Sequence, residues 1–200
     1  MIRIEKPASP HPFSSNTYII SSNDEYAVVD PSVPFSFFEI ADKVKYILLT
    51  HSHFDHILDI DDWVKNTSAK VMISEYEIDF LSDPGKNCYR QFLSLEKGYF
   101  GKAHPLSDGD ILKLGDEEIK VMLTDGHTRG SLCYLVSDVA FVGDTVFEGG
   151  GYGRFDLPSG DYLSLRRSID RICELPSDMV LYPGHGYETS VCKFKKDFMI

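Results

Sequence analysis

The sequence predicts one domain that combines β-strands with α-helices. Two patterns indicate this fold class: short apolar runs bounded by turn residues, and longer stretches with apolar residues at helical spacing. The chain of 200 residues is long enough to bury a sizeable core, and no shift of composition marks a second domain. We therefore expect a single domain over residues 1–200.

Apolar runs rich in β-branched and aromatic residues predict the strands. Turn residues such as Gly, Asn, Asp and Ser separate these runs, and Pro31 ends the second run because proline cannot continue a central strand. The predicted strands are residues 16–20, 27–30, 46–49, 71–73, 111–114, 119–123, 132–136, 139–142 and 179–182.

Helical spacing of apolar side chains predicts the helices. Residues 57–65 place Ile57, Ile60 and Trp63 on one face and acidic residues on the other. A second helix covers residues 163–172, with Ser159 or Asp161 at its start. A weaker helical pattern covers residues 35–43, a short helix covers residues 75–81, and a C-terminal helix buries Val191, Phe194 and Phe198.

Residues 83–108 show little periodicity but are rich in aromatic residues. Long irregular segments inside compact domains are often lids or binding loops. A loop that its own aromatic side chains fix onto the core is an equally good interpretation of this segment.

The densest group of polar side chains is Thr50-His51-Ser52-His53-Phe54-Asp55-His56, directly after the predicted strand at residues 46–49. Imidazole and carboxylate groups are the ligands that zinc, iron and manganese take in proteins. The alternative is a pair of core histidines, with Asp55 as the cap of the following helix. Three imidazoles and one carboxylate so close together favour a metal site.

Three further predicted strands end in a ligand-type residue beside glycine, namely Gly126-His127, Gly143-Asp144 and Gly184-His185. Glycine allows the backbone to turn tightly and to approach a ligand closely. Each pair alone is typical of an ordinary turn. Four strand ends that each present His or Asp are hard to explain by packing, so the sequence predicts that they converge on one site.

The charge balance limits the classes of partner. The chain has 20 Lys and Arg against 31 Asp and Glu, a net charge of −11, and such a surface repels nucleic-acid phosphates.

The N-terminus lacks the apolar core of a signal peptide, and no apolar run has the length of a membrane span. Four scattered cysteines indicate reduced thiols. We expect a cytoplasmic protein with a small-molecule substrate, no nucleic acid and no membrane; the sequence does not indicate its oligomeric state.

Five motifs in this order resemble those of the metallo-β-lactamase-fold hydrolases: Asn16-Thr17-Tyr18, residues 50–56, Gly126-His127-Thr128, Gly143-Asp144-Thr145 and Gly184-His185-Gly186. The resemblance covers essentially the whole chain. It implies an α+β fold, a four-layer αββα sandwich with metals in the cleft between two sheets. A bridging Asp144, with no cysteine at that site, distinguishes the chain from the true β-lactamases.

The resemblance also implies the ligand set and the metals. His51, His53 and His127 would hold one divalent metal, and Asp55, His56 and His185 a second, with Asp144 bridging them. Zinc is the favoured metal, with iron or manganese as alternatives. Asp30, Thr50 and Thr145 are candidates for contacts behind the ligands.

Residues 153–161 are similar to a signature of short glyoxalase II-like proteins, which are hydroxyacylglutathione hydrolase-like. Arg154 and Tyr187 fall where that group places substrate-binding residues, although a surface salt bridge is the alternative for Arg154. Only one short helix follows His185, so we expect the C-terminal glutathione-binding helical domain of full-length glyoxalase II to be absent.

The activity implied by this resemblance is thioester hydrolysis. Two cations that share a bridging water lower its pKa, so that hydroxide exists at neutral pH and can attack the thioester carbonyl. Asp55 is the candidate catalytic residue, because it can bind a metal and orient the nucleophile. The alternatives are a mononuclear iron persulfide dioxygenase, a lactone hydrolase and a non-enzymatic metal-binding scaffold; the acidic charge disfavours RNA processing.

Overall fold

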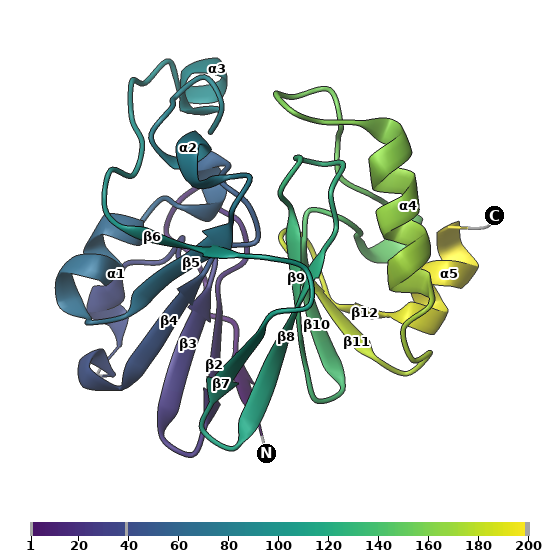
Figure 1. Cartoon of the computed structure of the whole chain (residues 1–200), viewed down its shortest axis with the longest axis horizontal. Coiled ribbons are helices and arrows are strands. Elements are labelled where there is room, and N and C mark those ends of the chain that lie inside the picture. The colour runs from purple at the N-terminus through teal and green to yellow at the C-terminus, as the bar shows by residue number, and fades with distance from the viewer. Residues whose placement is uncertain (1, 39, 199–200) are drawn as a thin grey trace.

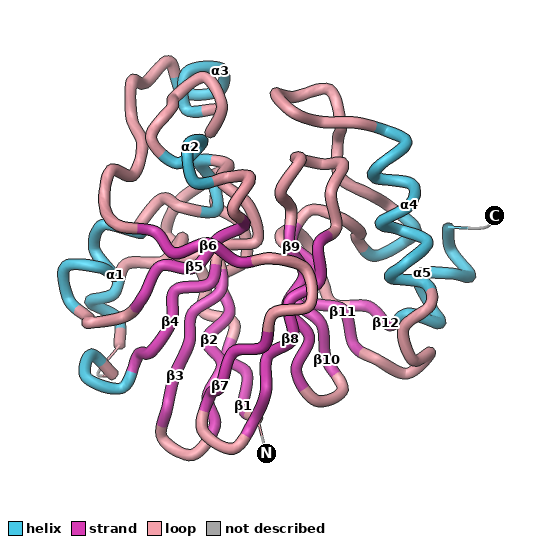
Figure 2. The backbone as a smooth tube through the Cα atoms, viewed as in Figure 1, coloured by secondary structure: helices cyan, strands magenta, loops and turns pink. Residues whose placement is uncertain are grey.

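Two six-stranded sheets form the centre of the molecule (Figure 1). The computed structural model describes residues 2–38 and 40–198. The sheets pack against each other, and helices lie on the outer side of each sheet (Figure 2). This arrangement confirms the predicted α+β fold, a four-layer αββα sandwich.

The first sheet contains the strands of the N-terminal half in chain order, β1-β2-β3-β4-β5-β6. The pairs β1–β2 and β2–β3 are antiparallel, whereas β3, β4, β5 and β6 run parallel. Parallel neighbours bring the ends of β3 and β4 to one edge of the sheet, where polar side chains follow both strands. The bounds are β1 Arg3–Glu5, β2 Tyr18–Ser22, β3 Glu25–Val29, β4 Val44–Leu48, β5 Lys70–Ser74 and β6 Ala103–Leu106.

The second sheet contains the strands of the C-terminal half, in the order β12-β11-β10-β9-β8-β7. β7 to β10 are joined as antiparallel neighbours, β10 and β11 are parallel, and β12 returns antiparallel to β11. The bounds are β7 Ile111–Leu114, β8 Glu117–Leu123, β9 Leu132–Val136, β10 Val139–Gly143, β11 Val180–Pro183 and β12 Thr189–Ser190.

Three hydrophobic clusters hold the layers together. The cluster between the sheets includes Tyr18 and Phe141, and the outer clusters are built around Trp63 on the first sheet and Phe194 on the second. The helix at residues 162–173 begins as predicted, because the Asp161 side chain accepts a hydrogen bond from the Ser164 backbone N–H. The helix bounds are α1 Ile60–Asn66, α2 Ile78–Leu81, α3 Tyr89–Leu93, α4 Tyr162–Cys173 and α5 Val191–Phe198.

The sequence patterns miss three strands, and all three lie at sheet edges. β1 and β6 are the two edges of the first sheet, and β12 is an edge of the second. Each has only two to four residues, too few to show an alternating pattern. β6 also contains Pro105, which an edge strand tolerates because one side of the strand needs no ladder hydrogen bond.

Three predicted helices differ from the observed structure. The weak pattern at residues 35–43 corresponds to two single-turn 3-10 helices, Phe35–Phe37 and Ala41–Lys43, not to an α-helix. The helix predicted at residues 57–65 begins at Ile60, because residues 54–56 form their own 3-10 turn. The short helix predicted from Glu75 begins at Ile78.

Residues 83–108 contain α3 and β6 and are fixed to the core by aromatic side chains. Tyr89 and Tyr99 are buried in the cluster on the outer side of the first sheet.

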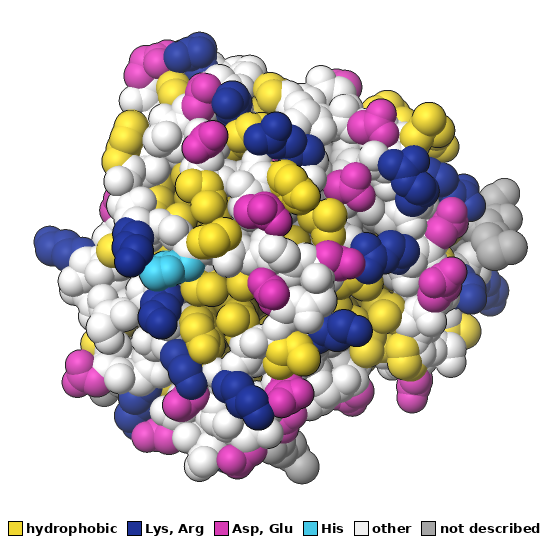
Figure 3. Space-filling model, viewed as in Figure 1, with side chains coloured by type: hydrophobic (Ala, Val, Ile, Leu, Met, Phe, Trp, Pro, Cys, Tyr) yellow, Lys and Arg dark blue, Asp and Glu magenta, His cyan; other side chains and the backbone are white. Residues whose placement is uncertain are grey.

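Seen from the same side as the ribbon, the surface carries acidic and basic side chains around hydrophobic ones in the middle of the face (Figure 3). Among the helices of the described residues, none is long and apolar enough to cross a membrane.

Candidate metal centre

Three histidine rings meet at the end of the sandwich where β4 and β8 finish. His51 Nε2 lies 3.0 Å from His53 Nδ1 and 3.2 Å from His127 Nε2, and the last two atoms are 3.0 Å apart. His51 and His53 follow β4 of the first sheet, whereas His127 follows β8 of the second. One ligand group is therefore assembled from both sheets.

A second group lies beside the first. Asp55 Oδ2 is 3.1 Å from His185 Nε2 and 3.9 Å from His56 Nε2. Asp55 and His56 lie in the 3-10 turn after the motif's second histidine, and His185 follows β11. The three ligand atoms all lie within 4.8 Å of one another.

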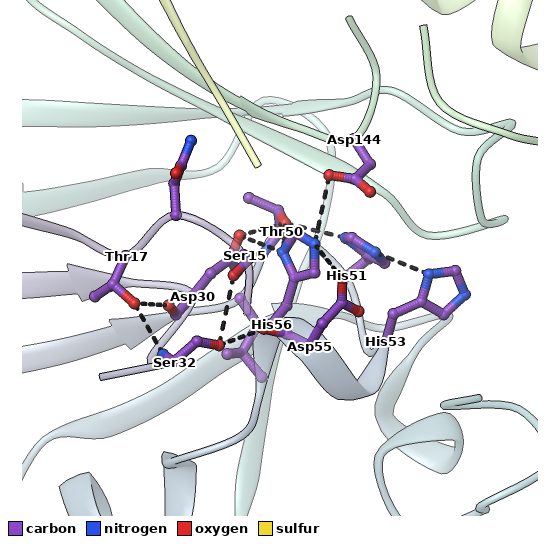
Figure 4. Close-up of polar contacts among 12 residues, drawn as sticks. Ser15, Thr17, Asp30, Ser32, Thr50, His51, His53, Asp55, His56 and Asp144 are labelled. Carbon is purple, nitrogen blue, oxygen red and sulfur yellow. Dashed lines mark hydrogen bonds and ion pairs between the residues drawn. The ribbon is translucent and has the colours of Figure 1, made fainter. Parts of the chain in front are cut away.

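The Asp144 carboxylate lies between the two groups. Its Oδ1 is 3.4 Å from His56 Nε2, while its Oδ2 is 3.5 Å from His185 Nε2 and 3.7 Å from His127 Nε2. Asp144 directly follows β10, so a third strand end of the second-sheet half enters the site. Figure 4 shows part of this convergence, with Asp144 approaching the histidines from the side opposite their own loop.

Hydrogen bonds behind the rings direct lone pairs toward the centre. His127 Nδ1 donates to the carbonyl oxygen of Arg154 at 2.6 Å, and His56 Nδ1 donates to Asp30 at 2.8 Å. A neutral imidazole with its proton on the outer nitrogen has a free lone pair on the inner one. These contacts therefore assign both rings the tautomer that a metal requires.

Three buried atoms of the centre have no hydrogen-bond partner among the described residues: His53 Nε2, His56 Nε2 and Asp144 Oδ1. Buried polar atoms of folded proteins nearly always have a partner, because leaving one unpaired costs about 1–3 kcal/mol. The last two of these atoms lie 3.4 Å from each other, where the two ligand groups meet. Nitrogen and carboxylate donors arranged in this way fit divalent cations of the zinc type.

The electrostatics of the centre also favour cations. Burial and the neighbouring His127 together lower the pKa of His53 to about 3, so His53 is neutral. Burial also opposes charge on His56 and Asp144. The carboxylates of Asp30 and Asp144 nevertheless raise the pKa of His56, and His56 holds the pKa of Asp144 well below its usual range. The site thus combines a neutral His53 with ionised carboxylates, the forms that bind metals, and a cation bound at His56 would take the place of the proton that Asp30 and Asp144 favour there.

Asp30 supports the centre from behind, as the sequence predicted. Its carboxylate accepts from the Thr50 backbone N–H at 2.8 Å, from the Thr50 hydroxyl at 2.7 Å and from His56 (Figure 4). His51 Nδ1 lies 3.1 Å from the same hydroxyl. Thr145 instead donates to the Thr124 hydroxyl, so the predicted role of Thr145 behind the ligands is wrong.

The Asn16-Thr17-Tyr18 motif holds the loop that carries His185. The Asn16 side chain donates to the carbonyl oxygens of Pro183, at 2.9 Å, and Gly186, at 3.0 Å. The Tyr18 hydroxyl donates to the same Pro183 oxygen at 2.7 Å. The N-terminal motif therefore ties β2 of the first sheet to the end of β11 in the second.

Sequence patterns gave no signal for Glu77, which is buried just before α2. Its carboxylate accepts hydrogen bonds from the backbone N–H and the hydroxyl of Ser52, and from the Gly130 backbone N–H at 3.3 Å. Ser52 lies between the first two histidines of the motif, and Gly130 lies in the loop that carries His127. Glu77 thus joins the two loops that form the three-histidine group.

We expect Glu77→Gln to weaken metal binding at the three-histidine group by about 10–100-fold, the usual effect of losing a group that orients ligands. The amide cannot accept all three hydrogen bonds, so the two loops would separate. Competition with a chromophoric chelator measures the affinity. Glu75→Gln is the matched control, because Glu75 is exposed and, among the described residues, its carboxylate accepts a side-chain hydrogen bond only from Ser107. Equal zinc affinity in both variants would contradict this role for Glu77.

The two predicted substrate-binding residues lie in different surroundings. Arg154 lines the cavity in front of the ligands, but its guanidinium binds Asp156 through two hydrogen bonds of 2.7 Å. Tyr187 is 70% exposed and is not among the residues that line this cavity. The predicted substrate contacts of Arg154 and Tyr187 stay predictions.

Comparison with known proteins identifies the family. Residues 11–185 match the family model described as "Metallo-beta-lactamase superfamily". The chain belongs to the metallo-β-lactamase superfamily. Together with the His and Asp ligand groups, membership identifies it as a metal-dependent hydrolase of this superfamily.

Relatives within the superfamily match most of the chain. "Probable metallo-hydrolase YqgX" of Bacillus subtilis (strain 168) is 31% identical over 188 residues, which is 90% of this chain and 89% of that protein. "Probable polyketide biosynthesis zinc-dependent hydrolase PksB" of the same organism is 34% identical over 170 residues, 82% of this chain and 68% of that protein. The crystal structure of BLEG-1 B3 metallo-beta-lactamase superposes with a TM-score of 0.87 at 28% identity, covering 98% of this chain and 97% of that one.

Proposed function

We propose that this superfamily member hydrolyses thioesters, those of hydroxyacylglutathione among them, with two divalent metal ions. The observation that carries the proposal is the position of Asp144 between two complete ligand groups. Zinc is the proposed metal because the donors are imidazoles and carboxylates, and because the relative PksB is described as a zinc-dependent hydrolase.

The metal ions, when bound, would supply an activated water nucleophile and would stabilise the oxyanion that forms at the carbonyl. The chain supplies the positioning. The Asp55 carboxylate lines the cavity and is the candidate catalytic residue. Burial acts to raise its pKa, but His56 and a hydrogen bond from His185 lower it overall, so Asp55 is ionised and can accept a hydrogen bond from the attacking water.

The leaving group fits a site without a free general acid. A thiol has a pKa of about 8.5, so it can leave as thiolate without a proton from the protein. The seven predicted ligands account for the His and Asp side chains at the centre, and none of them needs to serve as that acid. An ester or amide leaving group, being more basic, would need one.

Release of free thiol from S-lactoylglutathione tests the proposal. We expect turnover by the zinc-loaded protein, loss of turnover after treatment with a chelator, and recovery when zinc is restored. Absence of thioester cleavage by the zinc-loaded protein would refute thioester hydrolysis. In that case, oxygen consumption on glutathione persulfide with one iron per chain would identify a dioxygenase, and cleavage of lactones would identify a lactonase.

Metal content gives a separate test of the two ligand groups. We expect two metal ions per chain in the purified protein, and one in His56→Ala, because that change removes a ligand of the Asp55 group and leaves the three-histidine group intact. Elemental analysis measures both. His185→Ala is the companion variant, since its ring is partly exposed and its removal disturbs the core less. Two full equivalents of metal in both variants would contradict the ligand assignment.

A further inference from the structure

The cavity in front of the ligand groups has two chemically different walls. Its volume is about 520 Å³, within the range of pockets that bind small molecules. Candidate metal ligands form one wall: His53, Asp55, His127, Asp144 and His185. The other wall is largely apolar and includes Pro12, Phe13, Phe54, Phe92, Phe147 and Leu157.

Two aromatic side chains of the apolar wall are unusually exposed for their size. Phe13 is 65% exposed and Phe92 is 48% exposed. The Phe92 ring stacks on Phe54, with centroids 5.6 Å apart and an angle of 27° between the planes. Phe54 itself lies between two motif residues, His53 and Asp55, so the aromatic surface continues directly into the metal centre. Exposed apolar groups that gather around a cavity mark a binding surface.

The apolar wall is built from segments far apart in the sequence. Phe13 precedes β2, Phe92 belongs to α3 and Phe147 follows β10. α3 and the segment leading into α4 extend beyond the same end of the two sheets (Figure 1). Packing within one segment therefore does not explain why these aromatic side chains face one cavity.

The cavity offers little to bind an anionic substrate group apart from the metal centre. Arg154 is the one Lys or Arg lining this cavity in the described part of the chain. Asp156 accepts hydrogen bonds from Nε and Nη2 of its guanidinium, and the hydrogen bond from Arg154 lowers the pKa of Asp156 to about 2, so Asp156 is ionised at neutral pH. The guanidinium also lies 5.8 Å from the centroid of the Phe92 ring. Its positive charge is thus already balanced within the protein.

We infer that the preferred substrates are thioesters whose acyl group is an uncharged aliphatic or aromatic chain. This inference rests on the proposed thioester hydrolysis and specifies its substrate class. With the reacting carbonyl at the metal centre, the acyl chain extends over Phe54 toward Phe92 and Phe13. Phe92 and Phe13 are then specificity-determining residues, and a short, hydroxylated acyl group such as lactoyl uses only part of the cavity.

A series of N-acetylcysteamine thioesters tests this inference, because the thiol is constant and uncharged. We expect kcat/KM to rise from acetyl through butanoyl to hexanoyl, by about fourfold for each added methylene until the cavity is filled. Phe92→Ala should lower kcat/KM for the hexanoyl thioester by roughly tenfold and that for the acetyl thioester far less. Phe100→Ala is the matched control, since Phe100 is 78% exposed and does not line the cavity.

The outcomes separate this inference from the proposed function. Equal kcat/KM for all acyl lengths, or equal loss for acetyl and hexanoyl thioesters in Phe92→Ala, would overturn the inference while leaving thioester hydrolysis in place. If no thioester is cleaved, calorimetric titration with S-ethyl- and S-hexyl-N-acetylcysteamine still measures the apolar preference. Tighter binding of the hexyl compound supports the apolar site, and equal binding refutes it.

Discussion

Asp144→Ala is expected to lower kcat/KM for thioesters at least about a hundredfold, the upper end of the range for disturbing the surroundings of a metal. Asp144 is the carboxylate placed between the two ligand groups, with one oxygen toward His56 and the other toward His185 and His127. Without it, two cations would lie close together with less compensating charge. Steady-state kinetics with metal analysis of the same preparation measures both effects.

Two further variants make the result specific. Asp144→Asn keeps the shape but removes the charge, and we expect most of the same loss. Asp178→Ala removes an exposed carboxylate from the turn before β11 and should leave activity unchanged. Circular dichroism should show the fold retained in all three. An Asp144→Ala protein with full metal occupancy and near-normal activity would show that Asp144 does not bridge the two metals.

Gly184→Ala should cause a loss of similar size although it replaces none of the predicted ligands. A Cβ atom at Gly184 would lie 2.1 Å from Asp144 Oδ1 and 2.7 Å from His56 Cε1, far inside van der Waals contact. Both side chains would have to move, and a displacement of about 1 Å at a catalytic site can cost about a hundredfold in rate. We expect lower metal content together with the lower activity.

Gly151→Ala is the matched control for this change. Its nearest neighbour would be 3.4 Å from the new Cβ, and its backbone does not require a positive φ. Normal activity in Gly184→Ala would mean that the loop after β11 moves freely enough to accept the methyl group. The close packing of Gly184 against Asp144 and His56 would then play no part in holding the ligands.

Local sequence patterns singled out the residues that the structure brings together as candidate ligands, because each follows an apolar strand. The end of a strand is visible in the sequence, and a His or Asp beside glycine at that point is a local signal. The edge strands β1, β6 and β12 gave no such signal, since two to four residues cannot display a period. The predicted starts of α1 and α2 were too early, because residues in the single turns before these helices have the same spacing as residues in a helix.

Features that depend on distant contacts could not be predicted. Glu77 holds the two histidine loops together through hydrogen bonds that it accepts from Ser52 and Gly130. These residues lie 25 and 53 residues away in the chain. Within residues 83–108, Tyr89 is buried while Phe92 lines the cavity, although both are aromatic residues of the same short helix. Which of them packs into the core depends on where the helix meets the rest of the fold.

The division of the strands between the two sheets has a consequence for biosynthesis. The first sheet consists entirely of strands from the N-terminal half, and the second entirely of strands from the C-terminal half. During translation, the first sheet and the whole motif from His51 to His56 leave the ribosome before His127, Asp144 and His185 do. The inner face of the first sheet stays uncovered until the second half arrives. The metal centre can therefore be completed only once β11 and the loop with His185 have emerged.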